Sequence, residues 1–335
     1  MLYRQKLDTF IRRYDDVGYI VNKSNFIDRV VDASGVAFLL ALSREPQDID
    51  RLGGKIAQSF ANADIETIKE DAVAFYAMLE EAGLIVSGMT GEELDRKDSR
   101  FSYTLIEPEI FNKDSMSGLG QIKKSSQEFL EDHFKSKPQL MAFQIELTSR
   151  CNERCVHCYI PHAEKTSDIA PELFFRVLEQ CHEMGVLDIT LSGGEALLHP
   201  QFCDFLRKAK EYDFSVAILS NLTLLNDEII SAMKEILLSS VQVSLYSMKA
   251  EIHDSISQLP GSFEKTKNAI LRLIDNDIPV QISCPVMKQN KDCYADVLKW
   301  AHEHKCRAHT DYIMMGRYDN TTDRATGFLL KKRRN

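Results

Sequence analysis

Apolar runs alternate with helical patterns along the second half of the chain. Short runs rich in β-branched residues occur at 143–147, 187–192, 215–220, 241–246, 280–286 and 308–314. Between them, apolar residues return every three or four positions, which predicts amphipathic helices at 171–185, 200–212, 226–237, 262–276 and 293–305. Strands that alternate with helices form a parallel sheet with right-handed crossovers. The pattern therefore predicts an α/β fold, a partial (βα)6 TIM-like barrel, over residues 139–318.

Residues 1–90 have a different order of elements. Strand patterns at 19–24 and 27–34 come first, and three helical patterns follow. Asp48 is suited to cap one of these helices, and Gly83 is suited to end the last one before a returning strand. This order predicts a small winged-helix α+β domain.

Two further segments lack sustained periodicity. Residues 91–138 mix charge, glycine and proline, which is typical of a linker or bridging region, with one amphipathic helix near 120–136. Residues 319–335 end in a basic "KKRR" stretch, which we interpret as a solvated tail.

Composition and charge exclude several classes of function. The apolar fraction of 44% is that of a globular protein, and the formal net charge of −9 gives no general attraction to nucleic acid or to an anionic membrane. No apolar run is long enough to span a membrane, and the N-terminus lacks the apolar core of a signal peptide. We therefore expect a cytoplasmic protein with no nucleic-acid or membrane partner.

Three of the eight cysteines are closely spaced, in the stretch "CNERCVHC". Cys151, Cys155 and Cys158 follow the first predicted strand of the barrel, where parallel strands place reactive groups at their C-terminal edge. Thiolates this close on one loop can bind adjacent irons of one cubane cluster and leave one iron open. A zinc site completed by His157 or His162, or a chance spacing, remains an alternative. The other five cysteines are scattered and fit core packing.

The second strand end carries the stretch "SGGE". Gly193 and Gly194 allow backbone groups to approach a ligand closely, and the Glu195 carboxylate can accept from an ammonium group. A tight turn between strand and helix would explain the glycine pair alone. In register with the cysteine loop, the pair becomes a more specific signal.

These two motifs resemble the signature of the radical S-adenosylmethionine (SAM) superfamily. The resemblance implies that Cys151, Cys155 and Cys158 hold a [4Fe–4S] cluster whose open iron binds SAM. It implies these SAM contacts: Ser192, Gly193, Gly194 and Glu195 at its amino group, His157 and Tyr159 near the adenine, and Ser220, Asn221, Ser244 and Tyr246 along its methionine or ribose portions. The sequence departs from the family at "SNLT", where Thr-Asn-Gly is common, and at Ala196, where proline is common. Ordinary hydrogen bonding at strand ends is the alternative for Ser220, Asn221, Ser244 and Tyr246.

The first domain resembles the PqqD-like fold that recognises the leaders of ribosomally made peptides. Residues 1–90 contain more acidic than basic side chains, which argues against the DNA binding of other winged helices. In the PqqD-like fold, a precursor's leader pairs as a strand along the edge of a sheet. The resemblance therefore implies a precursor peptide as the partner of this domain.

Together the resemblances imply a radical SAM peptide maturase that crosslinks or epimerises a precursor peptide and takes electrons from a protein such as flavodoxin or ferredoxin. Such enzymes usually continue into a cysteine-rich SPASM domain, but no cysteine follows Cys306 here. We therefore expect a shorter type or a truncated chain. The alternatives are a radical SAM enzyme that acts on a protein or small metabolite, and a non-catalytic protein that binds leaders.

Overall fold

The computed structural model describes residues 1–61, 64–98, 125–135, 137–236 and 238–311. The predicted tail at 319–335, much of the predicted linker and the last residues of the sixth predicted strand lie outside these ranges. The chain forms two compact units, one with the described residues through Met141 and one with those from Ala142 onward. No helix in the described ranges is both long and apolar enough to cross a membrane.

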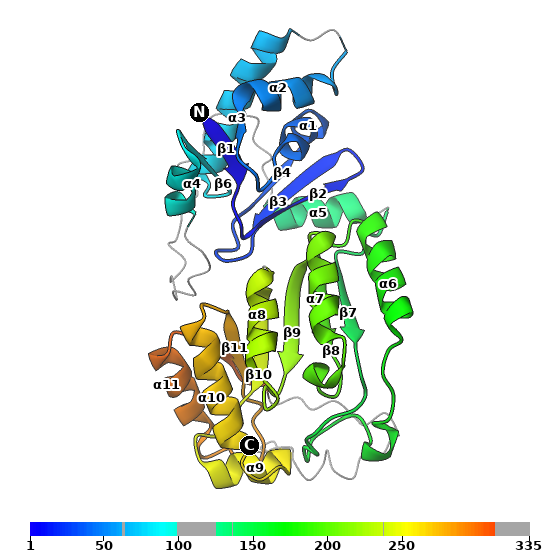
Figure 1. The fold of residues 1–335 in the computed structure, drawn as a ribbon, viewed down its shortest axis with the longest axis vertical. Coiled ribbons are helices and arrows are strands. Elements are labelled where there is room, and N and C mark those ends of the chain that lie inside the picture. The colour runs from blue at the N-terminus through cyan, green and yellow to red at the C-terminus, as the bar shows by residue number, and fades with distance from the viewer. Residues whose placement is uncertain (62–63, 99–124, 136, 237, 312–335) are drawn as a thin grey trace, which may run out of the picture. The chain divides into compact units, whose positions relative to one another are not determined.

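The first unit contains two small antiparallel sheets (Figure 1). One has the strand order β5-β1-β6, and the other has the order β2-β3-β4. The strands are β1 (Leu2–Gln5), β2 (Thr9–Tyr14), β3 (Val17–Asn22), β4 (Asp28–Val31), β5 (Gln47–Asp48) and β6 (Ile85–Gly88). The predicted strands correspond to β3, β4 and β6, whereas β1 and β2 precede the segment where strands were predicted.

Aspartate caps begin the first three helices of this unit. The side chains of Asp32, Asp48 and Asp64 accept hydrogen bonds from backbone N–H groups in the first turns that follow them. The helices are α1 (Ala33–Ala41), α2 (Ile49–Ala57), α3 (Ile65–Glu81), α4 (Gly91–Lys97) and α5 (Ser126–Phe134). The predicted cap at Asp48 and the predicted end of α3 at Gly83, where φ is 71°, are both confirmed.

The predicted linker contributes structure to the first unit. Helix α4 packs on β6, and the buried Asp98 that follows it accepts from Arg4 Nη2 at 3.0 Å. Helix α5 begins at Ser125 with a capping box to Glu128, close to where the amphipathic helix was predicted. At least the two ends of the 91–138 segment therefore have regular secondary structure.

The second unit is built on six parallel strands in the order β12-β11-β10-β9-β8-β7. They are β7 (Ala142–Glu146), β8 (Asp188–Ser192), β9 (Ser215–Ser220), β10 (Leu238–Ser244), β11 (Val280–Ser283) and β12 (Arg307–His309). In the described ranges β7 and β12 each pair on one side only, so the sheet is open. The predicted α/β class with a partial barrel is confirmed.

Helices cover one face of this sheet. They are α6 (Pro171–Glu183), α7 (Phe202–Glu211), α8 (Asp227–Glu235), α10 (Ser262–Asp275) and α11 (Tyr294–Glu303), and a further helix, α9 (Ala250–Ser257), packs against α10. All were predicted except α9, a short helix between β10 and α10. Its eight residues span only about two turns, too few to show a clear apolar period in sequence.

Candidate active site

The cysteine loop follows β7 at the C-terminal edge of the sheet. The thiols of Cys151, Cys155 and Cys158 are half-buried and form no disulfide. The backbone N–H of Glu153 donates to Cys151 Sγ at 3.4 Å, and the Cys155 thiol donates to Glu153 Oε2 at 3.2 Å. The loop is thus folded around a buried carboxylate that the sequence reasoning did not single out.

Burial sets the protonation of this loop. Desolvation raises the pKa of Cys151 to about 11 and raises that of Cys155 well above its usual value. Desolvation also raises the pKa of Glu153 to about 7. Metal ligation requires thiolates, so binding iron here would release protons.

The donor set fits an iron–sulfur cluster. Three soft thiols on one loop match the ligands of such clusters, and carboxylate or imidazole ligands are not needed. In the part of the chain that the structure describes, no three histidine, cysteine, aspartate or glutamate side chains are arranged to hold a single metal ion. The role of the three cysteines as cluster ligands stays a prediction.

The Gly-Gly-Glu segment lies directly against the start of the cysteine loop. The N–H of Gly194 donates to Thr148 O at 2.6 Å, and the N–H of Glu195 donates to Arg150 O at 2.8 Å. Gly193 has φ of 146°, which disfavours any other residue. A Cβ on Gly194 would lie 2.3 Å from Arg150 O. The two glycines therefore allow two backbone segments to pack closer than side chains would permit.

Glu195 links two strand ends through its buried carboxylate. The carboxylate accepts from Leu197 N at 3.0 Å, from Ser220 Oγ at 2.7 Å and from Asn221 N at 2.7 Å. Burial raises the pKa of this carboxyl, and the three donors oppose that effect. Glu195 thus holds the end of β9 beside the end of β8, whether or not it also meets an ammonium group.

Asn221 connects the end of β9 to the cysteine loop. Its Nδ2 donates to Asn152 Oδ1 at 3.0 Å, and Asn152 Nδ2 donates to Thr223 Oγ1 at 2.6 Å. Leu222, which stands where the family often has glycine, has φ of 61° and is buried. Asn152 was not among the predicted site residues, because its partner lies 69 positions away.

Tyr246 lies beneath the cysteine loop between two histidines. Its hydroxyl donates to Cys155 Sγ at 3.7 Å, and its ring centroid is 5.2 Å from that of His157 and 5.1 Å from that of His253. Ser244 is the last residue of β10, two positions before Tyr246, and its side chain is half-buried. The buried Tyr246 therefore packs against a predicted ligand.

The other predicted contacts lie at the ends of β7 and β8. The Tyr159 hydroxyl donates to Glu146 Oε1 at 3.3 Å, at the end of β7. Ser192 ends β8, is buried, and accepts from Leu147 N at 2.9 Å through its carbonyl oxygen. All the predicted site residues thus lie in or beside the cysteine loop or at the ends of β8, β9 and β10, and their contacts with SAM stay predictions.

Helix α9 supports the cysteine loop from below. The N–H groups of Arg154 and Val156 donate to the carbonyls of Ser257 and Ile256 at 3.0 and 2.9 Å. The Asp254 carboxylate accepts from the N–H groups of Gly261 and Phe263, which holds the turn into α10. Without the cysteine loop, the carbonyls of Ile256 and Ser257 in the last turn of α9 would have no partner within the helix. No sequence pattern identified this contact, because α9 itself was not predicted.

Acidification should destabilise the fold through His253. The side chain is 1% exposed, and burial lowers its pKa to about 4. The unfolded chain binds a proton near pH 6.5 and the folded chain does not, so stability is lost as the pH falls from 6.5 toward 4, by at most about 3 kcal/mol. In His253→Asn, whose carbonyl can replace Nδ1 as the acceptor for Tyr246 N, this loss should shrink. Urea unfolding across that range measures it, and an unchanged pH dependence would contradict it.

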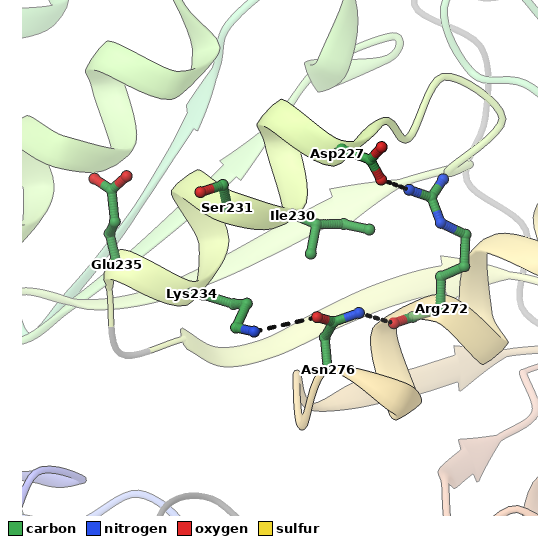
Figure 2. A pocket seen from close by; sticks show the side chains of 7 residues that line it. All are labelled: Asp227, Ile230, Ser231, Lys234, Glu235, Arg272 and Asn276. Atoms are coloured by element: carbon green, nitrogen blue, oxygen red, sulfur yellow. Dashed lines mark hydrogen bonds and ion pairs between the residues drawn. The ribbon is translucent and has the colours of Figure 1, made fainter.

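A separate groove lies in the helix layer between α8 and α10, with a volume of about 440 Å³ (Figure 2). Four of its polar side chains bind one another in pairs: Arg272 pairs with Asp227, and Lys234 donates to Asn276 Oδ1 at 3.2 Å. The lining residues are Asp227, Ile230, Ser231, Lys234, Glu235, Arg272 and Asn276. These two side-chain pairs connect α8 to the C-terminal part of α10. The groove is distinct from the candidate site at the strand ends.

Comparisons with known proteins agree with this geometry. The family model of the radical SAM superfamily matches residues 145–301. The chain is 30% identical over 194 residues to the AdoMet-dependent heme synthase of Methanosarcina barkeri, covering 56% of this chain and 54% of that protein. It is 32% identical over 155 residues to the antilisterial bacteriocin subtilosin biosynthesis protein AlbA of Bacillus subtilis. This alignment covers 46% of this chain and 35% of AlbA. The chain thus matches about half or less of these relatives' lengths.

Crystal structures of Streptococcus suis SuiB have a similar fold. The structure bound to SAM aligns with a TM-score of 0.59 at 16% identity and covers 94% of this chain and 66% of SuiB. The structure bound to the precursor peptide SuiA aligns with a TM-score of 0.56 at 16% identity. This alignment covers 92% of this chain and 62% of SuiB. The superfamily uses a [4Fe–4S] cluster and SAM. Residues 145–301 of this chain are therefore a radical SAM domain.

Proposed function

We propose that this chain is a radical SAM peptide maturase, which cleaves SAM reductively and modifies a ribosomally made precursor peptide. The observation that carries the proposal is the direct packing of the Gly-Gly-Glu segment on the cysteine loop. Glu195 N donates to Arg150 O, one residue before Cys151. A cluster ligand set and a SAM-binding edge would then form one rigid site.

Each part of the site has a task in this proposal. Cys151, Cys155 and Cys158 hold the cluster, and the Tyr246 hydroxyl donates to the sulfur of Cys155. With both bound, the reduced cluster would pass one electron to SAM, which would split at its C5′–S bond into methionine and a 5′-deoxyadenosyl radical able to take a hydrogen atom from the substrate. Backbone groups of Gly193 and Gly194 orient SAM, and the buried surroundings exclude water.

Two comparisons support the peptide substrate and the role of the first unit. AlbA is named for bacteriocin biosynthesis, and the SuiB likeness covers most of this chain, including residues of both units. In the proposal, residues 1–90 bind the leader along a sheet edge, and a flavodoxin or ferredoxin supplies electrons. A radical SAM enzyme that acts on a small metabolite is the second candidate, supported by the 30% identity to a heme synthase.

Anaerobic reconstitution tests the first step. With iron and sulfide the chain should become brown and, with dithionite, convert SAM to 5′-deoxyadenosine. The substrate is tested by co-expression with peptides from neighbouring short open reading frames and by their mass spectra. A colourless protein that retains only zinc would contradict the cluster, and a loss of hydrogen from a metabolite without any change in peptide mass would favour the second candidate.

A further inference from the structure

The strands of the second unit have two faces of opposite character. Alternate residues on the helix side are apolar and at most 2% exposed. They are Ile189 and Leu191 on β8, Val216 and Ile218 on β9, Val241 and Val243 on β10, and Val280 and Ile282 on β11. The residues between them occupy the opposite face, which the helices do not cover.

That opposite face is half-buried and mostly polar. We define its central part as the neutral face: Thr190, Ala217, Leu219, Ser240, Gln242, Ser244, Gln281 and Ser283. The strand register pairs Gln242 with Gln281, and Gln281 Nε2 donates to His309 Nδ1 at 3.1 Å. Gln242 forms no side-chain hydrogen bond with another residue in the ranges that the structure describes. A carboxamide with an open donor and an open acceptor therefore stands beside a second one.

The neutral face lies next to the candidate active site. Gln242 is two residues before Ser244, where β10 ends, and two residues of a strand span about 7 Å. A radical can remove a hydrogen atom only from a substrate that lies in contact with the site where the radical forms. A substrate that reaches the strand ends would therefore also meet Gln242 and Gln281.

Charge selects among ligand classes. Every residue of the neutral face is uncharged. The charged residues of the same sheet face are Glu146 and Asp188 on β7 and β8, and Arg307 on β12, which the strand register pairs with Gln281. A nucleoside triphosphate carries several negative charges, and beside the neutral face the described strands offer it Arg307 as a cation but also the carboxylates of Glu146 and Asp188, so its desolvation would be poorly offset. An apolar macrocycle would leave the glutamine amides and serine hydroxyls without partners. A peptide main chain presents uncharged N–H and C=O groups, which a glutamine carboxamide matches with one acceptor and two donors.

We infer that Gln242 and Gln281 bind the main chain of the substrate peptide and so select a peptide over a nucleotide. The inference rests on the proposed function, because it assigns the substrate of the same site. Gln242 and Gln281 are here specificity-determining residues that touch the substrate.

The test uses the full, reconstituted chain and, as probe, the purified product of the short open reading frame that neighbours its gene. Peptide conversion is normalised to the 5′-deoxyadenosine formed without peptide, which reports an assembled site. The double variant Gln242→Leu/Gln281→Leu should raise the apparent KM for the peptide about 100-fold, about tenfold for each glutamine. The isosteric variant Gln242→Glu/Gln281→Glu, which loses the same donors, should give a loss in the same direction. The matched control Gln180→Leu, on the exposed side of α6, should convert peptide like the wild type.

The outcomes separate the inference from the proposed function. If the double variants convert peptide with the wild-type KM, the inference is overturned and the proposed function stands. If the wild type forms 5′-deoxyadenosine but leaves the peptide unchanged, or if it converts MgGTP instead, both are overturned.

Discussion

Gly194→Ala should give a chain that assembles no iron–sulfur chromophore and forms no 5′-deoxyadenosine. The added Cβ would lie 2.3 Å from Arg150 O and 2.5 Å from Ser149 O, both backbone atoms that cannot rotate away. To relieve this contact, the end of β8 must move off the cysteine loop and break the hydrogen bonds from Gly194 N and Glu195 N. Overpacking and two lost hydrogen bonds together cost about 3 to 5 kcal/mol.

Gly54→Ala is the matched control for this substitution. Gly54 lies inside α2, and a Cβ there would have no neighbour within 4 Å. The exchange should therefore keep full iron content and raise stability by about 0.5 to 1 kcal/mol, because alanine favours a helix interior. Iron and sulfide content, visible absorbance and thermal unfolding are measured on both chains. Wild-type iron content and SAM cleavage in the Gly194→Ala chain would show that the close packing is not required.

Replacing any one of Cys151, Cys155 and Cys158 by alanine should abolish SAM cleavage. Each removal takes away one of three predicted protein ligands of the cluster, and the half-buried loop has no fourth thiol in sequence to replace it. Cys155→Ala should also leave the Tyr246 hydroxyl without its sulfur acceptor in a buried position. Iron per chain, the electron paramagnetic resonance signal after dithionite, and 5′-deoxyadenosine formation report the loss.

Cys203→Ala serves as the control for the cysteine series. Cys203 lies on α7, is half-buried and is not part of the loop. The Cys203→Ala chain should therefore bind iron and cleave SAM like the wild type. If the three loop variants retain full iron, or if only zinc content responds to them, the cluster assignment is wrong.

The sequence alone predicted those features that depend on neighbours along the chain. Alternating apolar periods predicted all six strands of the second unit, and a cap at Asp48 predicted the start of α2. The spacing of Cys151, Cys155 and Cys158 and its position after a strand were readable for the same reason. A parallel sheet then brings the ends of β7, β8, β9 and β10 to one edge, so the general place of the site followed.

The tertiary structure decided how those strand ends are joined. Glu195 meets Ser220 across 25 positions, Asn152 meets Asn221 across 69, and Tyr246 meets Cys155 across 91. The carbonyls at the end of α9 hold the cysteine loop about 100 residues before them in sequence. Local propensity carries no information about such pairs, because each depends on which buried polar groups remain unpaired once the sheet has formed. The sequence by itself determined the spacing and order of the three predicted cluster ligands, and the fold determined which residues contact them.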